Sequence, residues 1–174
     1  EDDAIEEAES VHENEEQSSE EDATEIEAKD EDSMMFEVTM DSSPNVFGDF
    51  EYEETDDGTI IITKYTGSTT VVDIPDQIDG KDVTIIDEFV FNNKQLTSVS
   101  LPNKLKEIRR DAFRNNRISS IQLPDTLEVI GLGGLSDNLF TTITLPNNLK
   151  ILEVNALRDN NLISIELPPN IEKI

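Results

Sequence analysis

The 174-residue chain has no cysteine, no tryptophan and one histidine. The absence of cysteine excludes disulfides, thiolate zinc sites, iron–sulfur clusters and a cysteine nucleophile. The single histidine, His12, lies in a run of acidic residues, which excludes a histidine-built metal centre and a histidine-dependent catalytic triad. No apolar run approaches the ~18 residues that a membrane-spanning helix needs. We therefore expect no metal, no cofactor, no catalytic residue and no membrane-spanning segment.

Basic residues are also few, and they are unevenly distributed. The chain carries 40 acidic residues against 13 lysines and arginines, a net charge of -27, so it should repel nucleic acid. Residues 1–58 hold 25 acids and one base, Lys29. Such a segment buries too little apolar surface to offset the entropy of ordering it. We expect residues 1–48 to form an acidic, mostly disordered tail or linker. A helix is the alternative, but like charges four residues apart, as in Glu9 and Glu13, oppose it.

Residues 49–74 are expected to form an N-terminal β cap. Phe50–Glu53 alternates apolar and acidic residues, which is typical of a half-buried strand. Asp56-Asp57-Gly58 is a hairpin-turn signal because Asp and Gly tolerate positive φ. Thr59–Tyr65 then returns as a β-branched strand.

Residues 75–174 form an internal repeat with a period of 22. The first unit contains a five-residue insertion around Gln77–Val83, where Gly80 supplies the turn, and the last unit is truncated. The prolines that follow a leucine and the apolar positions all keep the same offset. These columns include Pro102, Pro124, Pro146 and Pro168; Leu105, Leu127, Leu149 and Ile171; Ile108, Ile130, Leu152 and Ile174; Ile118, Phe140 and Leu162; and Val99, Ile121, Ile143 and Ile165.

The pattern of one unit predicts how it folds. Alternation directs Val99 and Leu101 inward and places Ser98 and Ser100 on the opposite side. A proline then ends the strand, and the next apolar residues, at spacings of three to five, predict short helical or irregular turns. A single unit cannot bury its apolar face, but stacked units can. The sequence therefore predicts an α/β solenoid, a leucine-rich-repeat right-handed superhelix with short parallel strands, since its period falls in the range of ~20–29 residues.

These residues carry a resemblance to a known family. Leu96–Pro102, followed by Leu105, Ile108, Asp111–Phe113 and Asn115-Asn116, resembles the BspA-type leucine-rich repeat of bacterial cell-surface proteins. The resemblance covers residues 57–174. It implies a secreted or cell-surface protein that binds a host or neighbouring-cell protein or glycan without catalysis. Gly131–Leu135 departs from the pattern, and its glycines predict a looser, less helical turn.

The outward strand positions are the first candidate ligand-binding surface, on the concave face of the solenoid. They are small, polar and nearly uncharged, which suits contact with a peptide or glycan. A simpler interpretation is that Ser and Thr pair well across strands and keep this face wet, since no aromatic residue supplies a binding hot spot. The residues are Ser98, Ser100, Ser120, Gln122, Thr142, Thr144, Ser164 and Glu166.

A basic cluster is the second candidate. Six bases fall within 14 residues of a chain that is otherwise acidic: Lys104, Lys106, Arg109, Arg110, Arg114 and Arg117. The cluster suits an anionic partner such as a sulfated glycan, or the chain's own acidic tail. A solvated outer face is the simplest interpretation. Asp56-Asp57 and Asp159-Asn160 lack the spacing of an EF-hand calcium loop, so we expect no metal there.

The predicted function is therefore a ligand-binding or adhesion module, and the alternative is a structural spacer that presents another domain of a longer surface protein. The sequence does not predict an oligomeric state. It begins at Glu1 and contains no signal-peptide apolar stretch, so we expect a processed or trimmed chain. It stops at Ile174 in the middle of a unit, and we expect the natural protein to continue, because solenoids need a capping unit.

Overall fold

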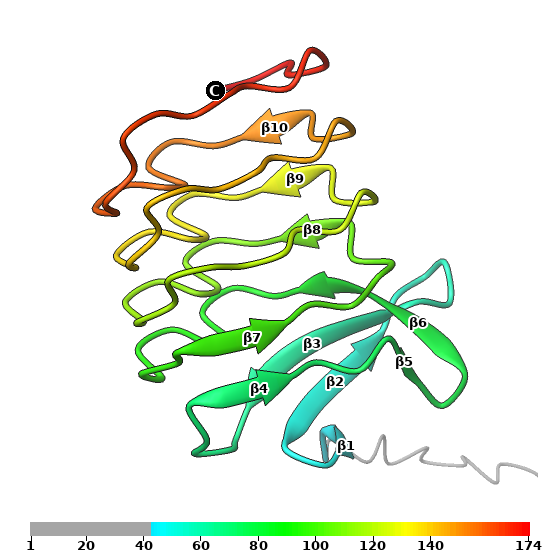
Figure 1. Ribbon diagram of the computed structural model, residues 1–174. Coiled ribbons are helices and arrows are strands. Elements are labelled where there is room, and N and C mark those ends of the chain that lie inside the picture. The colour runs from blue at the N-terminus through cyan, green and yellow to red at the C-terminus, as the bar shows by residue number, and fades with distance from the viewer. Residues whose placement is uncertain (1–42) are drawn as a thin grey trace, which may run out of the picture. The chain divides into compact units, whose positions relative to one another are not determined.

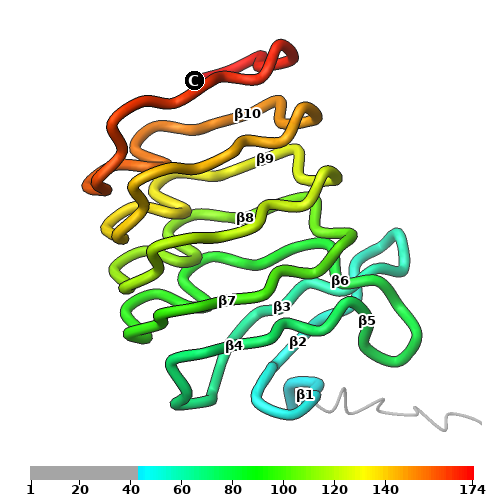
Figure 2. Tube along the Cα trace, viewed as in Figure 1, coloured from blue at the N-terminus to red at the C-terminus, as the bar shows by residue number. Residues whose placement is uncertain are grey.

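The computed structural model describes residues 43–174, which form a solenoid of stacked coils closed at its N-terminal end by a β cap (Figure 1). The expected acidic tail lies for the most part outside the described residues. Each coil follows the course of the one before it, so equivalent residues of successive coils lie one above another (Figure 2). The 22-residue period thus becomes the stacking repeat of the fold.

The cap is an antiparallel arrangement of β1 (Asn45–Phe47), β2 (Phe50–Glu54) and β3 (Ile60–Tyr65). β1 precedes residue 49, where we expect the cap to begin. β3 then pairs in parallel with β6 (Lys81–Ile86), so the cap and the solenoid share one sheet. The cap therefore covers the end of the core without interrupting the sheet.

The insertion in the first unit forms a hairpin between β5 (Gln77–Ile78) and β6. Its two turn residues, Asp79 and Gly80, have φ of 52° and 76°. Two positive φ angles define the tight turn whose twist matches paired strands. The hairpin is tied to the cap by a hydrogen bond from the Tyr52 hydroxyl to Asp79, 2.6 Å long, which raises the pKa of Tyr52.

A parallel ladder continues from β6 through β8 (Glu107–Ile108), β9 (Val129–Ile130) and β10 (Ile151–Leu152). We call this side of the solenoid face A. The opposite side, face B, carries β4 (Val71–Asp73) and β7 (Ser98–Ser100), which pair in parallel. Within the described residues, 120–122, 142–144 and 164–166 follow the same path on face B without regular strand pairing.

This arrangement corrects two expectations. The ladder that runs through all the coils lies on face A, in the segments expected to be helical turns, and residues 43–174 contain no helix. The spacing of Leu105 and Ile108 mimics a helix because the chain bends at Leu105, whose N–H bonds to the Pro102 carbonyl, and then runs extended. Both side chains therefore point inward without helical winding.

Left-handed residues shape the turn that follows each face A strand, and they exclude a helix there. Positive φ recurs at two positions of every coil, in columns 22 residues apart. Of the two turn types expected, the irregular one is found. The first column holds Phe89, Asp111, Gly133 and Asn155, and the second holds Asn93, Asn115, Asp137 and Asp159.

Gly133, with φ of 64°, belongs to the first of these columns. We expected the glycine-rich segment to loosen a helix, but no helix is present at this position. Gly133 meets the same backbone requirement, positive φ, that Asp111 and Asn155 meet in the neighbouring coils.

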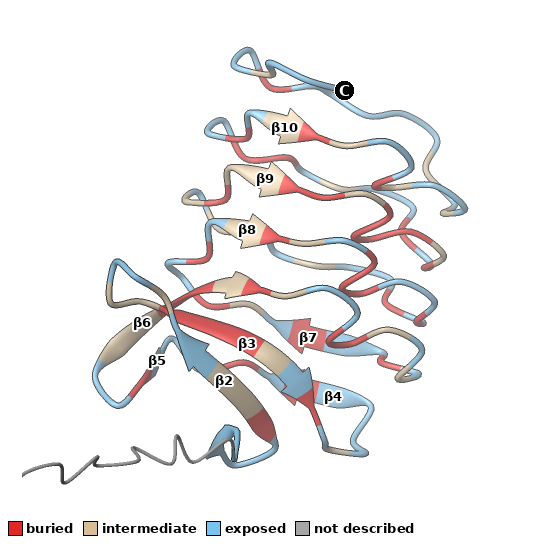
Figure 3. Ribbon diagram, turned by 180° about the vertical axis from the view of Figure 1, so that it is seen from behind, coloured by how far each residue is buried: buried red, intermediate tan, exposed pale blue. Residues whose placement is uncertain are grey.

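The core lies between the two faces and extends from the cap to the last coils (Figure 3). Phe91 and Phe113, both fully buried, stack with ring centroids 4.9 Å apart. Phe140 and the Leu105, Leu127 and Leu149 column are also fully buried. The predicted inward columns are thus the core in all units but the last, where Ile165 and Ile174 are exposed, and the solenoid fold is confirmed.

Buried asparagines connect the coils. Asn138 accepts a hydrogen bond from the Ile118 N–H and donates to the carbonyls of Phe113, Leu135 and Ser136. Asn116 bonds in the same way one coil earlier. Asn116 thus satisfies buried backbone groups through its side chain, while Asn115 before it takes the left-handed backbone of the turn.

Candidate binding surfaces

Face B displays the eight predicted outward side chains. All of them are exposed, while Val99, between Ser98 and Ser100, is 8% exposed. None of the eight makes a side-chain hydrogen bond or an ion pair within residues 43–174. Their hydroxyl, amide and carboxylate groups can therefore donate or accept hydrogen bonds with a ligand.

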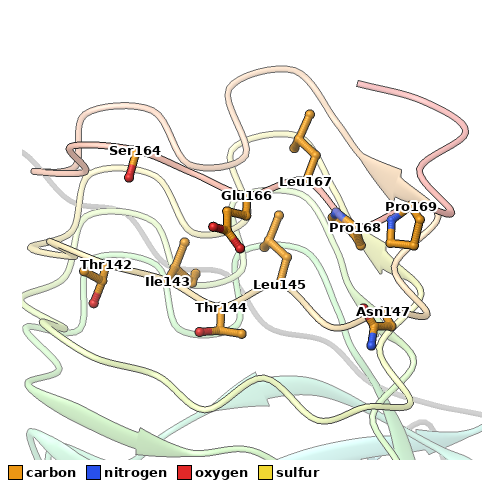
Figure 4. Close-up of a pocket in the computed structure, with 10 residues that line it drawn as sticks. All are labelled: Thr142, Ile143, Thr144, Leu145, Asn147, Ser164, Glu166, Leu167, Pro168 and Pro169. Atoms are coloured by element: carbon orange, nitrogen blue, oxygen red, sulfur yellow. The ribbon is translucent and has the colours of Figure 1, made fainter.

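A hollow of about 500 Å³ opens on the C-terminal part of this face. Ser164 and Glu166 line it from one coil, and Thr142 and Thr144 line it from the preceding coil (Figure 4). Apolar atoms of Leu145, Leu167 and two prolines complete the wall. The hollow therefore combines polar groups with an apolar surface, as ligand sites commonly do.

A second hollow of about 530 Å³ lies two coils earlier on the same face. It is lined by Ser100, Leu101, Asn103, Gln122 and Leu123, among others. Each of these stands 44 residues before its counterpart in the first hollow, which are Thr144, Leu145, Asn147, Glu166 and Leu167. The two hollows are thus repeats of one local shape.

The six clustered bases are distributed around one coil. Arg109 lies on face A, where its guanidinium is 2.9 Å from Asp87 and 3.4 Å from Glu107. Partial burial acts to lower the pKa of Arg109, but the bond to Asp87 and the nearby carboxylates outweigh it and raise that pKa. Arg114, in the following turn, bonds to Asp137 at 3.0 Å. The other four bases are exposed and make no ion pair within residues 43–174: Lys104, Lys106, Arg110 and Arg117.

Face A carries charges that are largely paired between coils. Lys150 lies 2.6 Å from Glu128, and Lys173 lies 2.8 Å from Glu153. The bond to Glu128 raises the pKa of Lys150, and the bond from Lys173 lowers the pKa of Glu153. These ion pairs join neighbouring coils, so most of the basic side chains of face A are paired within residues 43–174.

A third hollow, of about 620 Å³, lies on face A between the β2–β3 turn and the strands β8 and β9. Lys106 and Arg109 line it together with Asp57, Glu107 and Glu128. Two of the six clustered bases therefore meet here, but acids surround them.

The two acidic pairs singled out in the sequence bond to neighbouring residues of the chain. Asp57 accepts hydrogen bonds from the hydroxyls of Thr55 and Thr59, which lower its pKa. Asp159 is 2.9 Å from Arg158. Across residues 43–174, no group of three or more acidic or histidine side chains is placed to hold a metal ion. In the same residues, no helix has the length and hydropathy to cross a membrane.

Sequence reasoning missed one surface, at the turn after face A. Phe89 and Val154 are 49% and 59% exposed there, and Leu132 is half-buried. The signal was visible in Leu132 and Val154, two apolar residues 22 apart at a turn position where polar residues are typical.

Short parallel strands, a 22-residue coil and a continuous apolar core define this chain as a leucine-rich-repeat solenoid. A family model described as the BspA type leucine rich repeat region matches residues 64–174 in six copies. The chain therefore belongs to the BspA-type leucine-rich-repeat family. Proteins of this family and fold are typically non-catalytic repeat scaffolds, and many are surface proteins.

Solved structures of bacterial repeat proteins are similar to this chain. A leucine-rich repeat protein from Bacteroides capillosus is 27% identical, with a TM-score of 0.57, over 68% of this chain and 98% of that one. The T. pallidum leucine-rich repeat protein is also 27% identical, with a TM-score of 0.53, over 72% of each chain. A leucine rich cell surface protein from Faecalibacterium prausnitzii is 22% identical, with a TM-score of 0.44, over 75% of this chain and 50% of that one. No curated protein matches the chain significantly.

Proposed function

We propose that this chain is a non-catalytic ligand-binding or adhesion module of a secreted or cell-surface protein, and that face B binds a protein or glycan of a host or neighbouring cell. The single observation that carries the proposal is the state of the face B side chains. Eight exposed polar groups lie in register there and make no side-chain hydrogen bond or ion pair within residues 43–174.

The contrast with face A supports this assignment. On face A, inter-coil ion pairs such as Lys150–Glu128 engage the charged side chains. If the face B hydroxyls served to link neighbouring coils, side-chain bonds between coils would be expected, and none is found in the described residues. Face B is therefore better suited to contacts outside the chain.

The two equivalent hollows indicate the form of the ligand. They lie two coils apart, which is about 10 Å at the usual spacing of neighbouring strands. A chain-like ligand running along the solenoid axis would meet the same combination of hydroxyl, amide, leucine and proline twice. Repeated weak contacts of this kind add through effective concentration.

The test is retention of matrix proteins and sulfated glycans on the immobilised chain over a series of salt concentrations. Thr144→Arg places a long cation in the hollow of Figure 4 and should abolish retention of the bound ligand. Asn161→Arg is the matched control, because Arg117 occupies the same position two coils earlier.

Four outcomes are distinguishable. Loss of retention in Thr144→Arg with retention in Asn161→Arg supports face B as the binding face. Equal loss in both variants points to charge rather than to this face. If the unmodified chain retains no ligand, the structural spacer is the better description. An anionic ligand that ignores Thr144→Arg but is lost when Lys104 and Lys106 become Ser would move the site to these exposed bases.

A further inference from the structure

A second surface runs along the edge where each coil turns away from face A. Backbone hydrogen bonds fix its register: Phe89 N–H donates to the Arg110 carbonyl, Asp111 N–H to Leu132, and Gly133 N–H to Val154, at 3.0, 2.9 and 3.2 Å. Arg110, Leu132 and Val154 thus occupy one position in three successive coils; Glu88 holds that position in the first coil, and Phe89 follows it beside Arg110. We call Phe89, Arg110, Leu132 and Val154 the turn-edge stripe.

The stripe is unusually apolar for an exposed turn. Phe89 is 49% and Val154 59% exposed, and Leu132 is half-buried. Successive coils lie about 5 Å apart, so these residues lie in a row along the edge of the solenoid. Single exposed apolar residues need no explanation, but an aligned row is a feature of interaction surfaces.

Phe89 also adopts a backbone conformation that does not suit it. Its φ is 60°, in a column where the other coils have Asp111, Gly133 and Asn155. A bulky side chain is disfavoured there by contact with the following carbonyl, whereas Gly, Asn and Asp tolerate the conformation. Since Phe89 lies largely outside the core, folding does not account for an aromatic residue at this position.

Arg110 is the cation of the stripe, and Glu88, at the same position one coil earlier, forms no ion pair with it. The neighbouring Arg109 and Arg114 are held by carboxylates, but Arg110 is exposed and makes no ion pair within residues 43–174. Its guanidinium is therefore free to take a carboxylate from outside in a two-bond fork. An arginine flanked by aromatic and aliphatic side chains is the composition of binding hot spots, which face B lacks.

We propose that the turn-edge stripe binds an acidic, apolar segment of a partner protein: a carboxylate of the segment pairs with Arg110, and apolar side chains on either side cover Phe89 and the Leu132–Val154 pair. None of the four stripe residues lies on face B, so this proposal does not depend on the proposed function. The partner is a protein segment because the stripe offers a single cation between apolar contacts.

The test uses the full chain as bait for a displayed library of random 12-residue peptides. The expected peptides contain Asp or Glu flanked by apolar residues. Their affinity should fall at least tenfold for Arg110→Gln and for Phe89→Asn. Phe89→Asn suits the left-handed backbone, so we expect this variant to fold at least as well as the unmodified chain, and its thermal midpoint checks this. Leu139→Asn is the control: it removes an exposed leucine outside the stripe and has Asn161 as its equivalent in the next coil.

Three results would overturn the proposal: no peptide enriched over a blank surface, enrichment of basic peptides, or equal binding by Phe89→Asn and the unmodified chain. Sedimentation of the chain alone covers the remaining occupant. A dimer that is lost in both Phe89→Asn and Arg110→Gln would replace the partner segment with a second copy of this chain.

Discussion

The carboxylate of Asp111 occupies the space into which a Cβ atom at Gly133 would project. The two residues stand at equivalent positions of adjacent coils, and both have positive φ. Gly133 is therefore required for two reasons. Its φ is positive, and Asp111 of the preceding coil leaves no space for a Cβ atom.

Replacing Gly133 by Ala should destabilise the chain more than replacing Gly80, which also has positive φ but has open space where a Cβ atom would stand. The left-handed conformation alone should cost Gly80→Ala about 1–2 kcal/mol. Gly133→Ala must also displace the buried Asp111, so its loss should be larger by at least about 1 kcal/mol. Denaturant unfolding measures both. Equal losses of stability in the two variants would show that the Asp111 side chain moves aside without cost.

Asn138 should be among the most sensitive polar residues. Asn138→Leu leaves the buried Ile118 N–H without its partner and removes one donor each from the carbonyls of Phe113, Leu135 and Ser136, which keep their bonds from Asn116, Asn160 and the Asn115 N–H. We expect a loss of about 1–3 kcal/mol in the free energy of unfolding, which is the cost of one unsatisfied buried group. Asn160→Leu, half-buried at the equivalent position, is the comparison and should cost less. A smaller loss for Asn138 than for Asn160 would contradict this account.

Phe89→Asn should stabilise the chain by up to about 1 kcal/mol, because it removes a bulky residue from a left-handed position. The measurement is the thermal midpoint, with Phe91→Asn as the contrast, since Phe91 is fully buried and its replacement should be strongly destabilising. A lower midpoint for Phe89→Asn would mean that the exposed ring contributes to folding.

Acid should weaken the contact between the last two coils. The bond from Lys173 lowers the pKa of Glu153 in the folded chain, so its contribution is present above the ordinary carboxylate pKa and is lost as pH falls through the lowered pKa. The effect should be small because the pair is largely exposed. Glu153→Gln should reduce the difference between unfolding midpoints at pH 7 and pH 3. An unchanged difference would assign the acid sensitivity to other carboxylates.

The repeat period was the most informative part of the sequence. It predicted the solenoid and the inward columns, because an offset of 22 leaves equivalent residues one above another. The period could not show which face of the solenoid carries the continuous parallel strands. Leu105, Ile108 and Ala112 are spaced as in a helix, and the left-handed backbone of Asp111, which prevents one, is indicated only by comparing coils, since Gly133 and Asn155 hold the same position and a single Asp does not require positive φ.

The candidate surfaces were predictable to a similar degree. Alternation around Val99 was enough to infer which side chains are exposed on face B. The hollows on face B form where the proline-containing bends of adjacent coils meet. The sequence pattern does not show how these bends pack against one another. The ion pairs that separate Arg109 and Arg114 from the other bases also depend on packing between coils, so six neighbouring bases looked like one patch.

The hydroxyls of Thr59 and Thr84, 2.7 Å apart, join the cap to the first coil, and each later coil bonds to the one before it. Folding can then proceed coil by coil from the N-terminal hairpins, because each step adds one short segment to a coil that is already folded. A destabilising substitution halfway along the solenoid would stop this growth. The coils before it would stay folded, and the coils after it would unfold.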